Sequence, residues 1–170
     1  MVYITSDLHL GHNAIYKYRD RFKTRVEHDR YILDKIKSLS KRDILLVLGD
    51  FLFDCVDYEK YIQELSEAKC RIKLVMGNHD SLKLYKEDCV DVQLPLYSYK
   101  NMWVSHCPIH TQELRGRLGN IHGHLHLEHV KIGHNQFSGK DKRYFNVNID
   151  VNDYEFVRLE TIQEHFNQGG

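Results

Sequence analysis

Residues 72–80 read IKLVMGNHD, an apolar run followed at once by a glycine, an amide, an imidazole and a carboxylate. The run Ile72–Met76 has the length of a buried strand, and Gly77 permits a tight turn directly after it. In open α/β sheets, ligands bind just beyond the carboxyl ends of the strands. This stretch therefore predicts a strand that presents Asn78, His79 and Asp80 at a binding edge.

Four other apolar runs end in the same kinds of side chain. They are Val2–Thr5 before Asp7 and His9, Ile44–Leu48 before Gly49 and Asp50, Met102–Ser105 before His106, and Asn120–Ile121 before Gly123, His124 and His126. Two further strands are predicted at Phe145–Ile149 and Glu155–Leu159. Because loops at strand ends are held by the sheet, side chains far apart in sequence can converge there.

Helical periodicity fills the gaps between these runs. Apolar residues form one stripe in Glu27–Leu39 and another in Tyr58–Ala68, and a weaker helix is predicted at Ser81–Glu87. The segment Leu127–Arg143 has no clear period and is predicted to be a long loop or hairpin. Alternating strands and helices indicate a layered α/β fold. No Pro/Gly/Ser linker divides the chain, so we expect residues 1–170 to form a single domain.

Composition excludes several classes of function. The chain has 24 basic and 24 acidic residues, so its formal net charge is zero, which argues against a nucleic-acid polymer as its partner. No apolar stretch is long enough for a membrane span, and the N-terminus does not resemble a secretory signal. The four cysteines show no CxxC spacing and are read as reduced thiols. We therefore expect a cytoplasmic protein without membrane association.

The residues at the strand ends suit a metal centre. The set is rich in oxygen and nitrogen donors without thiolate, which suits Mn, Fe, Zn, Ni or Co rather than a structural cysteine-type zinc site. Asp7 and His9 are two residues apart, as are His124 and His126, so each pair faces one side of an extended chain. Seven candidate ligands are too many for one tetrahedral ion and suit two ions that share a carboxylate. Two such ions stabilise the attacking and the leaving oxygen atoms of a phosphoryl transfer.

Each signal also has a purely structural explanation. Asp7 and Asp50 could be turn residues, and Asp80 could cap a helix that begins near Ser81. His106 could be a buried histidine with satisfied hydrogen bonds, and the HGHLH run at residues 122–126 could be an adventitious metal-affinity patch. Together, these explanations would require five coincidences in sequence order.

The five motifs also resemble, in order, the complete motif series of the calcineurin-like metallophosphoesterase family. The resemblance covers residues 7–126, and the segment from Phe145 onward is similar to the closing strands of small bacterial and phage members. It implies a four-layer α-β-β-α sandwich of two mixed sheets. It also implies a phosphoesterase in which a hydroxide that bridges two divalent metal ions attacks phosphorus, and we favour manganese as the metal.

The resemblance assigns a role to each motif residue. The first ion would be held by Asp7, His9 and His126, and the second by Asn78, His106 and His124, with Asp50 bridging the two. His79 would protonate the leaving group or stabilise charge on the phosphoryl oxygens, and Asp80 would orient the His79 ring.

The resemblance fixes the chemistry more closely than the substrate. Gly49-Asp50 is followed by Phe51-Leu52 and not by the Arg-Gly of protein phosphatases in the family, and 170 residues leave no room for the capping domain of its larger nucleases. A small phosphodiester or phosphomonoester remains, and we favour the diester.

Three residues outside the motifs are candidates for substrate binding: His12, Arg115 and Arg143. The alternative to an enzyme is a non-catalytic scaffold of the same fold that binds a protein partner. Scaffolds of this kind generally lose ligands or the histidine at the position of His79, and this chain keeps all of them. The sequence does not indicate an oligomeric state.

Overall fold

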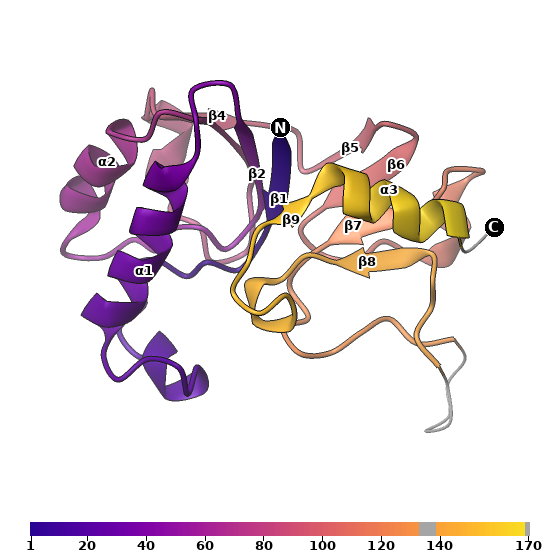
Figure 1. Cartoon of the computed structure of the whole chain (residues 1–170), viewed down its shortest axis with the longest axis horizontal. Coiled ribbons are helices and arrows are strands. Elements are labelled where there is room, and N and C mark those ends of the chain that lie inside the picture. The colour runs from indigo at the N-terminus through magenta and orange to yellow at the C-terminus, as the bar shows by residue number, and fades with distance from the viewer. Residues whose placement is uncertain (133–138, 169–170) are drawn as a thin grey trace.

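Two mixed β-sheets organise the chain, and the computed structural model describes residues 1–132 and 139–168 of it (Figure 1). The first sheet has the order β4-β3-β2-β1-β9, in which β9 is antiparallel to β1 and the other neighbours are parallel. Its strands are β1 (Val2–Thr5), β2 (Ile44–Leu48), β3 (Arg71–Val75), β4 (Val90–Val92) and β9 (Val157–Arg158).

The second sheet has the order β5-β6-β7-β8. β5 is antiparallel to β6, whereas the β6–β7 and β7–β8 pairs are parallel. Its strands are β5 (Leu96–Tyr99), β6 (Met102–Ser105), β7 (Asn120–His122) and β8 (Tyr144–Asn146). The parallel strands β6 and β7 end at one edge of this sheet, the arrangement that gathers side chains for binding.

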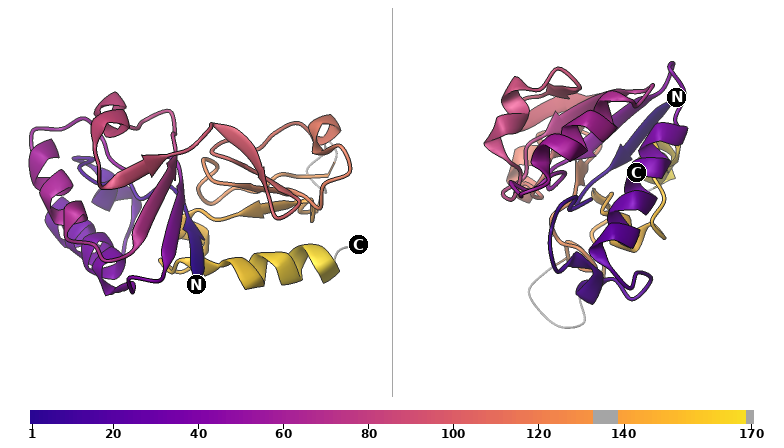
Figure 2. Two further views of the ribbon diagram at one scale, coloured as in Figure 1. Left: turned by 90° about the horizontal axis from the view of Figure 1, so that it is seen from above. Right: turned by 90° about the vertical axis from the view of Figure 1, so that its left-hand side faces the viewer.

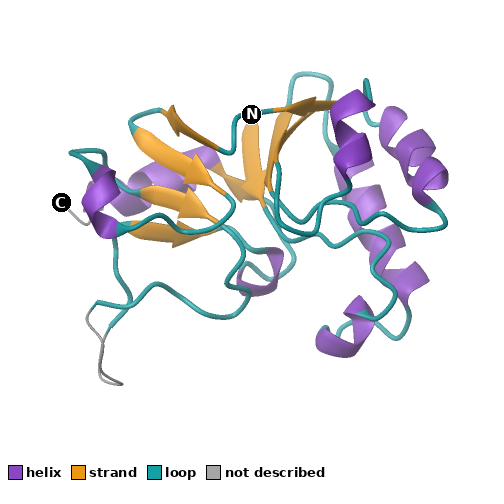
Figure 3. Cartoon of the chain, turned by 180° about the vertical axis from the view of Figure 1, so that it is seen from behind, coloured by secondary structure: helices purple, strands orange, loops and turns teal. Residues whose placement is uncertain are grey.

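Three α-helices flank the sheets: α1 (Arg25–Ser38), α2 (Tyr58–Ser66) and α3 (Leu159–Gln168). α1 and α2 cover one face of the first sheet, and α3 runs alongside the second sheet (Figure 2, Figure 3). Short 3₁₀ turns connect the larger elements, namely η1 (Ile15–Tyr18), η2 (Leu82–Lys86), η3 (Thr111–Leu114) and η4 (Ile149–Val151). Thr24 is the N-cap of α1, because its hydroxyl accepts a hydrogen bond from the Glu27 N–H.

The strands of the first sheet bury side chains on both faces, as continuous apolar runs in parallel sheets do. Leu45 and Val47 point toward α1 and α2, where they join one core. Leu46 and Leu48 point the other way, into a second core with residues of the second sheet and of α3. The two sheets therefore share a core and hold their strand ends in a fixed relation.

The expected fold class is confirmed, whereas several element boundaries were wrong. The strand expected at Phe145–Ile149 ends at Asn146, because the Asn148 side chain caps η4 by accepting from the Asp150 N–H. The strand expected at Glu155–Leu159 is only β9, and Leu159 begins α3. The helix expected at Ser81–Glu87 is the 3₁₀ turn η2, whose cap is Ser81 and not Asp80. β4, β5 and α3 were not predicted.

The expected loop Leu127–Arg143 contains no helix or named strand in its described part, although Lys131 and Lys140 form an isolated antiparallel bridge. Residues 133–138 of that loop lie outside the described residues. Within residues 1–132 and 139–168, no helix has both the length and the apolar run that crossing a bilayer requires.

Candidate metal centre

The loops that follow β1 and β2 run side by side and set the floor of the site. The Asp7 N–H donates to the Gly49 carbonyl at 2.9 Å, and the His9 N–H donates to the Asp50 carbonyl at 2.8 Å. The loop after β7 joins them, because the His124 N–H donates to the Asp7 carboxylate at 2.9 Å. Strand ends of both sheets therefore meet at one place.

A first group of donor atoms comes from Asp7, His9 and His126, whose ligating atoms all lie within 4.8 Å of one another. The Asp7 Oδ1 atom is 4.0 Å from His9 Nε2 and 3.9 Å from His126 Nε2. Donors that share an ion at about 2.1 Å lie roughly 3–4 Å apart, so this spacing fits a cation between them.

A second group surrounds His106. Its Nδ1 pairs with the Leu48 carbonyl at 2.7 Å, which leaves Nε2 directed at the site. Nε2 is 3.0 Å from Asn78 Oδ1, 3.2 Å from His124 Nδ1 and 3.5 Å from Asp50 Oδ1. The other Asp50 oxygen is 3.8 Å from His9 Nε2 in the first group. Asp50 thus lies between the two groups, the place that the family resemblance implied for the bridging ligand.

The structure brings all seven predicted ligands together, but not through an extended chain. Asp7, His9, Asp50, His124 and His126 all have positive φ angles, between 47° and 68°. Left-handed backbone is uncommon for residues other than glycine and gathers at functional sites. The expectation that Asp7 with His9, and His124 with His126, share a face through strand alternation was therefore wrong. Turns orient these side chains.

Two glycines are required by close approach. Gly49 has a φ of +81°, and a Cβ there would lie 2.3 Å from His106 Nδ1. A Cβ on Gly77 would lie 2.3 Å from Asp50 Oδ1. Any larger residue would displace a predicted ligand from one group or the other.

Buried atoms without partners test whether a cation fits. Asp7 is fully buried, and its Oδ1 has no hydrogen-bond partner among the described residues, as is also true of both ring nitrogens of His9. Such orphaned atoms are costly unless a ligand satisfies them. Burial lowers the pKa of His9 to about 2, so its ring is neutral and able to ligate. Burial raises the pKa of Asp7, a cost that a bound cation would offset. The residues present therefore fit divalent ions.

Asp80 contacts the backbone of the site, whereas the family resemblance implied that it orients His79. Its Oδ2 accepts from the N–H groups of Asp50 at 2.9 Å and Gly77 at 2.7 Å, and its Oδ1 accepts from Phe51 at 2.6 Å and Leu52 at 3.0 Å. Through both oxygens, Asp80 holds the backbone that carries Asp50.

Sequence reasoning missed a carboxylate behind the first group. Asp150, on η4, pairs with His126 Nδ1 at 2.8 Å and thereby leaves Nε2 free for an ion. The same carboxylate forms an ion pair with Arg19, which is 1% exposed and also donates to the Asp7 carbonyl at 2.6 Å. Asp150 directly follows the predicted strand Phe145–Ile149, so the strand-end rule applied to that strand would have found it.

Arg19 also connects the site to α1. Its Nη1 is 2.6 Å from Nε2 of His28, and the other ring nitrogen of His28 pairs with Asp29 at 2.8 Å. The Tyr61 hydroxyl donates to the same Asp29 carboxylate. The His28 ring is fully buried in this network.

A cleft of about 810 Å³ opens beside the first donor group. Its floor includes His9, His12, His79 and His126, and Phe53 stacks on His79 with ring centroids 5.2 Å apart. Burial lowers the pKa of His12. Arg115 and Arg143 are not among the described residues that line this cleft. Arg115 is exposed and paired with Glu113, and Arg143 is paired with Asp141.

Known proteins resemble this chain over nearly its whole length. The uncharacterized protein MJ1445 of Methanocaldococcus jannaschii is 28% identical over 170 residues, which cover 99% of this chain and 92% of that protein. A crystal structure of AQ665 from Aquifex aeolicus, a protein of unknown function, is similar with a TM-score of 0.72 and 26% identity, and covers 96% of this chain and 98% of that one.

A nuclease MPE from Pseudomonas putida shares the fold, with a TM-score of 0.53 and 21% identity over 74% of this chain and 61% of that one. The model of the calcineurin-like phosphoesterases matches residues 1–167. The chain therefore belongs to the calcineurin-like phosphoesterase family.

Proposed function

We propose that this protein is a dinuclear-metal-dependent phosphodiesterase that hydrolyses small phosphodiesters with an apolar or aromatic organic group. Membership of the family supports phosphoester hydrolysis. The observation that carries the preference for diesters is the cleft, which is lined by His9, His79 and His126 and also by the aromatic rings of Tyr18, Phe53 and Tyr154. A second ester arm has room there.

The charges along the cleft favour a substrate with one negative charge. Arg19 and Arg21 line it, but so do three carboxylates, those of Asp20, Glu128 and Asp150. Arg19 is already paired with Asp150 at 2.7 Å, and the Arg21 guanidinium lies over the Tyr31 ring. A phosphomonoester dianion would meet little uncompensated positive charge from side chains, whereas a diester carries one charge less.

The two donor groups would hold one divalent ion each, with Asp50 shared. When bound, such ions offset charge on the phosphoryl oxygens and lower the pKa of a water molecule so that it can act as the nucleophile. The side chains of the protein position the ions and donate a proton to the leaving group. His79 is exposed at the cleft, and its stacking on Phe53 holds the imidazole so that it can protonate the leaving oxygen.

A hydrolysis panel tests the proposal. Protein that has been stripped by a chelator and refilled with Mn²⁺ should cleave bis-p-nitrophenyl phosphate and a 2′,3′-cyclic nucleotide faster than p-nitrophenyl phosphate. His79→Ala should lower kcat by about 10²–10⁴-fold, with two ions still bound by elemental analysis. His129→Ala is the control, because His129 does not line the cleft.

Three results would oppose the proposal. Faster turnover of the monoester would contradict the preference for diesters. Near-normal kcat in His79→Ala would remove the proton donor from its role. Full metal occupancy without hydrolysis of any ester would favour the scaffold that binds a protein partner.

A further inference from the structure

We propose that Cys107 is an additional ligand at the second donor group and selects thiophilic divalent ions such as Zn²⁺ and Cd²⁺ there. The proposal rests on the proposed function, because it takes both donor groups to be occupied by metal in the working protein. It adds a sulfur donor to a centre for which the sequence predicts oxygen and nitrogen donors alone.

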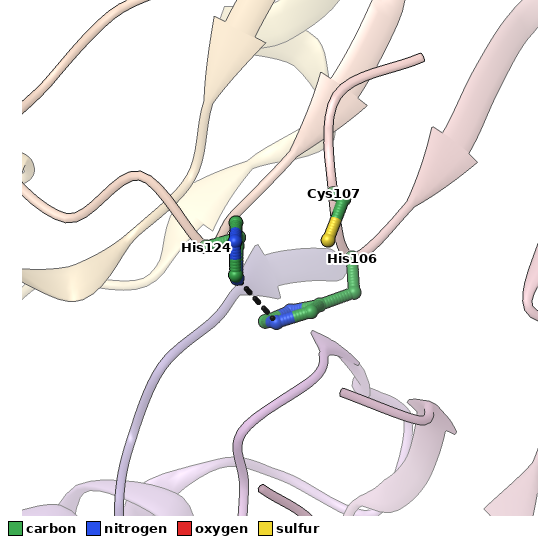
Figure 4. Close-up of side chains that lie close together, drawn as sticks. All are labelled: His106, Cys107 and His124. Atoms are coloured by element: carbon green, nitrogen blue, oxygen red, sulfur yellow. Dashed lines mark hydrogen bonds between the residues drawn. The ribbon is translucent and has the colours of Figure 1, made fainter. Parts of the chain in front are cut away.

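The thiol lies against two of the predicted ligands. Cys107 Sγ and one ring nitrogen each of His106 and His124 lie within 4.8 Å of one another. Figure 4 shows the sulfur directed toward the space between the two imidazoles. Cys107 is exposed, so an ion can reach the sulfur from solvent.

The backbone that carries the thiol is fixed to the strand ends. The Ser105 hydroxyl donates to the Cys107 carbonyl at 2.6 Å, and the Gly123 N–H donates to the His106 carbonyl at 2.9 Å. The turn after β6 is thereby tied to the end of β7, the element that leads to His124. The position of the sulfur beside His106 and His124 is built into the fold.

A separate observation indicates that this place takes a cation. Asp7, Asp50 and His106 also bring ligating atoms within 4.8 Å of one another, and the buried Asp7 Oδ1 has no hydrogen-bond partner among the described residues. Two carboxylates, one of them with an unsatisfied oxygen, therefore lie close to His106, as Cys107 does. An ion bound at His106 has oxygen donors and a sulfur donor nearby.

A sulfur donor changes which metal ions this group prefers. Thiolates prefer Zn²⁺ and other soft or borderline ions, whereas carboxylate oxygens suit harder ions such as Mn²⁺. On ligation the thiol releases its proton to solvent, and the Zn–S bond of about 2.3 Å fills a coordination position. Catalytic sites keep one position open for water or substrate. We therefore expect zinc to bind more tightly than manganese and to support slower turnover.

Cobalt provides a direct probe of the thiolate. Titration of the metal-free full chain with Co²⁺ should produce thiolate-to-cobalt charge-transfer absorption in the near ultraviolet, and Cys107→Ser should abolish it. Cys55→Ser is the matched control, since Cys55 belongs to the loop after β2 and is in none of the metal-binding groups. The control should keep the full absorption.

Metal affinity gives a second readout. Cys107→Ser should weaken Zn²⁺ binding about 10–100-fold, and Mn²⁺ binding should change by less than about threefold. Charge-transfer absorption that persists in Cys107→Ser, or an equal loss of Zn²⁺ and Mn²⁺ affinity, would overturn the proposal. Turnover with Mn²⁺ is measured separately, so failure of the phosphodiesterase proposal and failure of the sulfur ligand give different results.

Discussion

The Asp80 carboxylate organises the backbone of the site. Its two oxygens accept four backbone N–H groups, two of which belong to Asp50 and Gly77. An asparagine in its place would set an amide NH₂ against N–H donors. We expect Asp80→Asn to lower the free energy of unfolding by about 2–4 kcal/mol and to weaken metal binding in the same variant, measured by urea denaturation and by Mn²⁺ titration.

The exposed Asp88→Asn substitution is the control for this experiment, because Asp88 is close in sequence and lies outside the metal-binding groups. If Asp80 instead acted by orienting His79, then Asp80→Asn would reduce kcat while stability and metal binding stayed unchanged.

The sequence was sufficient to find the candidate metal donors but not the side chains that hold them in place. Carboxylates, amides and imidazoles directly after apolar runs are visible in the sequence because chemistry restricts which residue types can ligate. Which strand end faces which is set by tertiary packing, so the strand-end rule could have pointed to Asp150 but not to its pairing with His126.

The short turn η4 positions a carboxylate that supports the metal centre. It places Asp150 between His126 and the buried Arg19. Asp150→Asn removes the charge that compensates Arg19, and breaking a buried pair is strongly destabilising. We expect the free energy of unfolding to fall by about 3 kcal/mol and metal affinity to fall about 10–100-fold. Chemical denaturation and metal titration measure the two effects.

Asp153→Asn supplies the comparison at the same end of the chain. Asp153 is exposed and has a φ of 52°, a conformation that asparagine tolerates. Equal losses in both variants would mean that the effect of Asp150→Asn does not come from the ion pair.

Element prediction succeeded where periodicity was long enough to read. α1, α2 and the core strands β1, β2 and β6 match their expected ranges closely, since each shows a continuous apolar run or stripe. β4 has only three residues, and the side chains of β5 alternate between exposed and half-buried, so neither gave a clear apolar pattern. The capping side chain of Asn148 overrode the strand tendency of Ile149.

For the molecule as a whole, buried histidines couple stability to pH. Burial lowers the pKa of His122 to about 4, whereas the unfolded chain binds that proton near pH 6.5. Between these values the unfolded state holds more protons, so stability decreases as pH falls from 6.5 to 4. The expected slope is about 1.4 kcal/mol per pH unit for this proton, measured by urea denaturation of metal-free protein at several pH values.

His122→Gln should flatten this dependence by about one proton, whereas the exposed His110→Gln should leave it unchanged. The comparison of variants is needed to isolate His122, because burial raises the pKa of Asp7, and that change makes stability depend on pH in the opposite direction. An identical slope in His122→Gln and the original protein would show that His122 is not the source.

The family resemblance that the motifs suggested is confirmed for the whole molecule, as are the two mixed sheets. The motifs sufficed for this because their order along the chain is itself specific. Substrate contacts were harder to predict, since Arg115 and Arg143 look available in sequence and the fold engages both in local ion pairs.

The predicted ligands are divided between the two sheets, with Asp7, His9, Asp50 and Asn78 on loops of one and His106, His124 and His126 on loops of the other. Cations bound by these residues would cross-link the loops of the two sheets. Any ligand that binds only the folded chain stabilises it, by a free energy that rises with the logarithm of the ligand concentration once this exceeds Kd. In a cell that lacks the metal, the protein would then be both inactive and less stable against unfolding. Restoring the metal supply would restore activity and stability together.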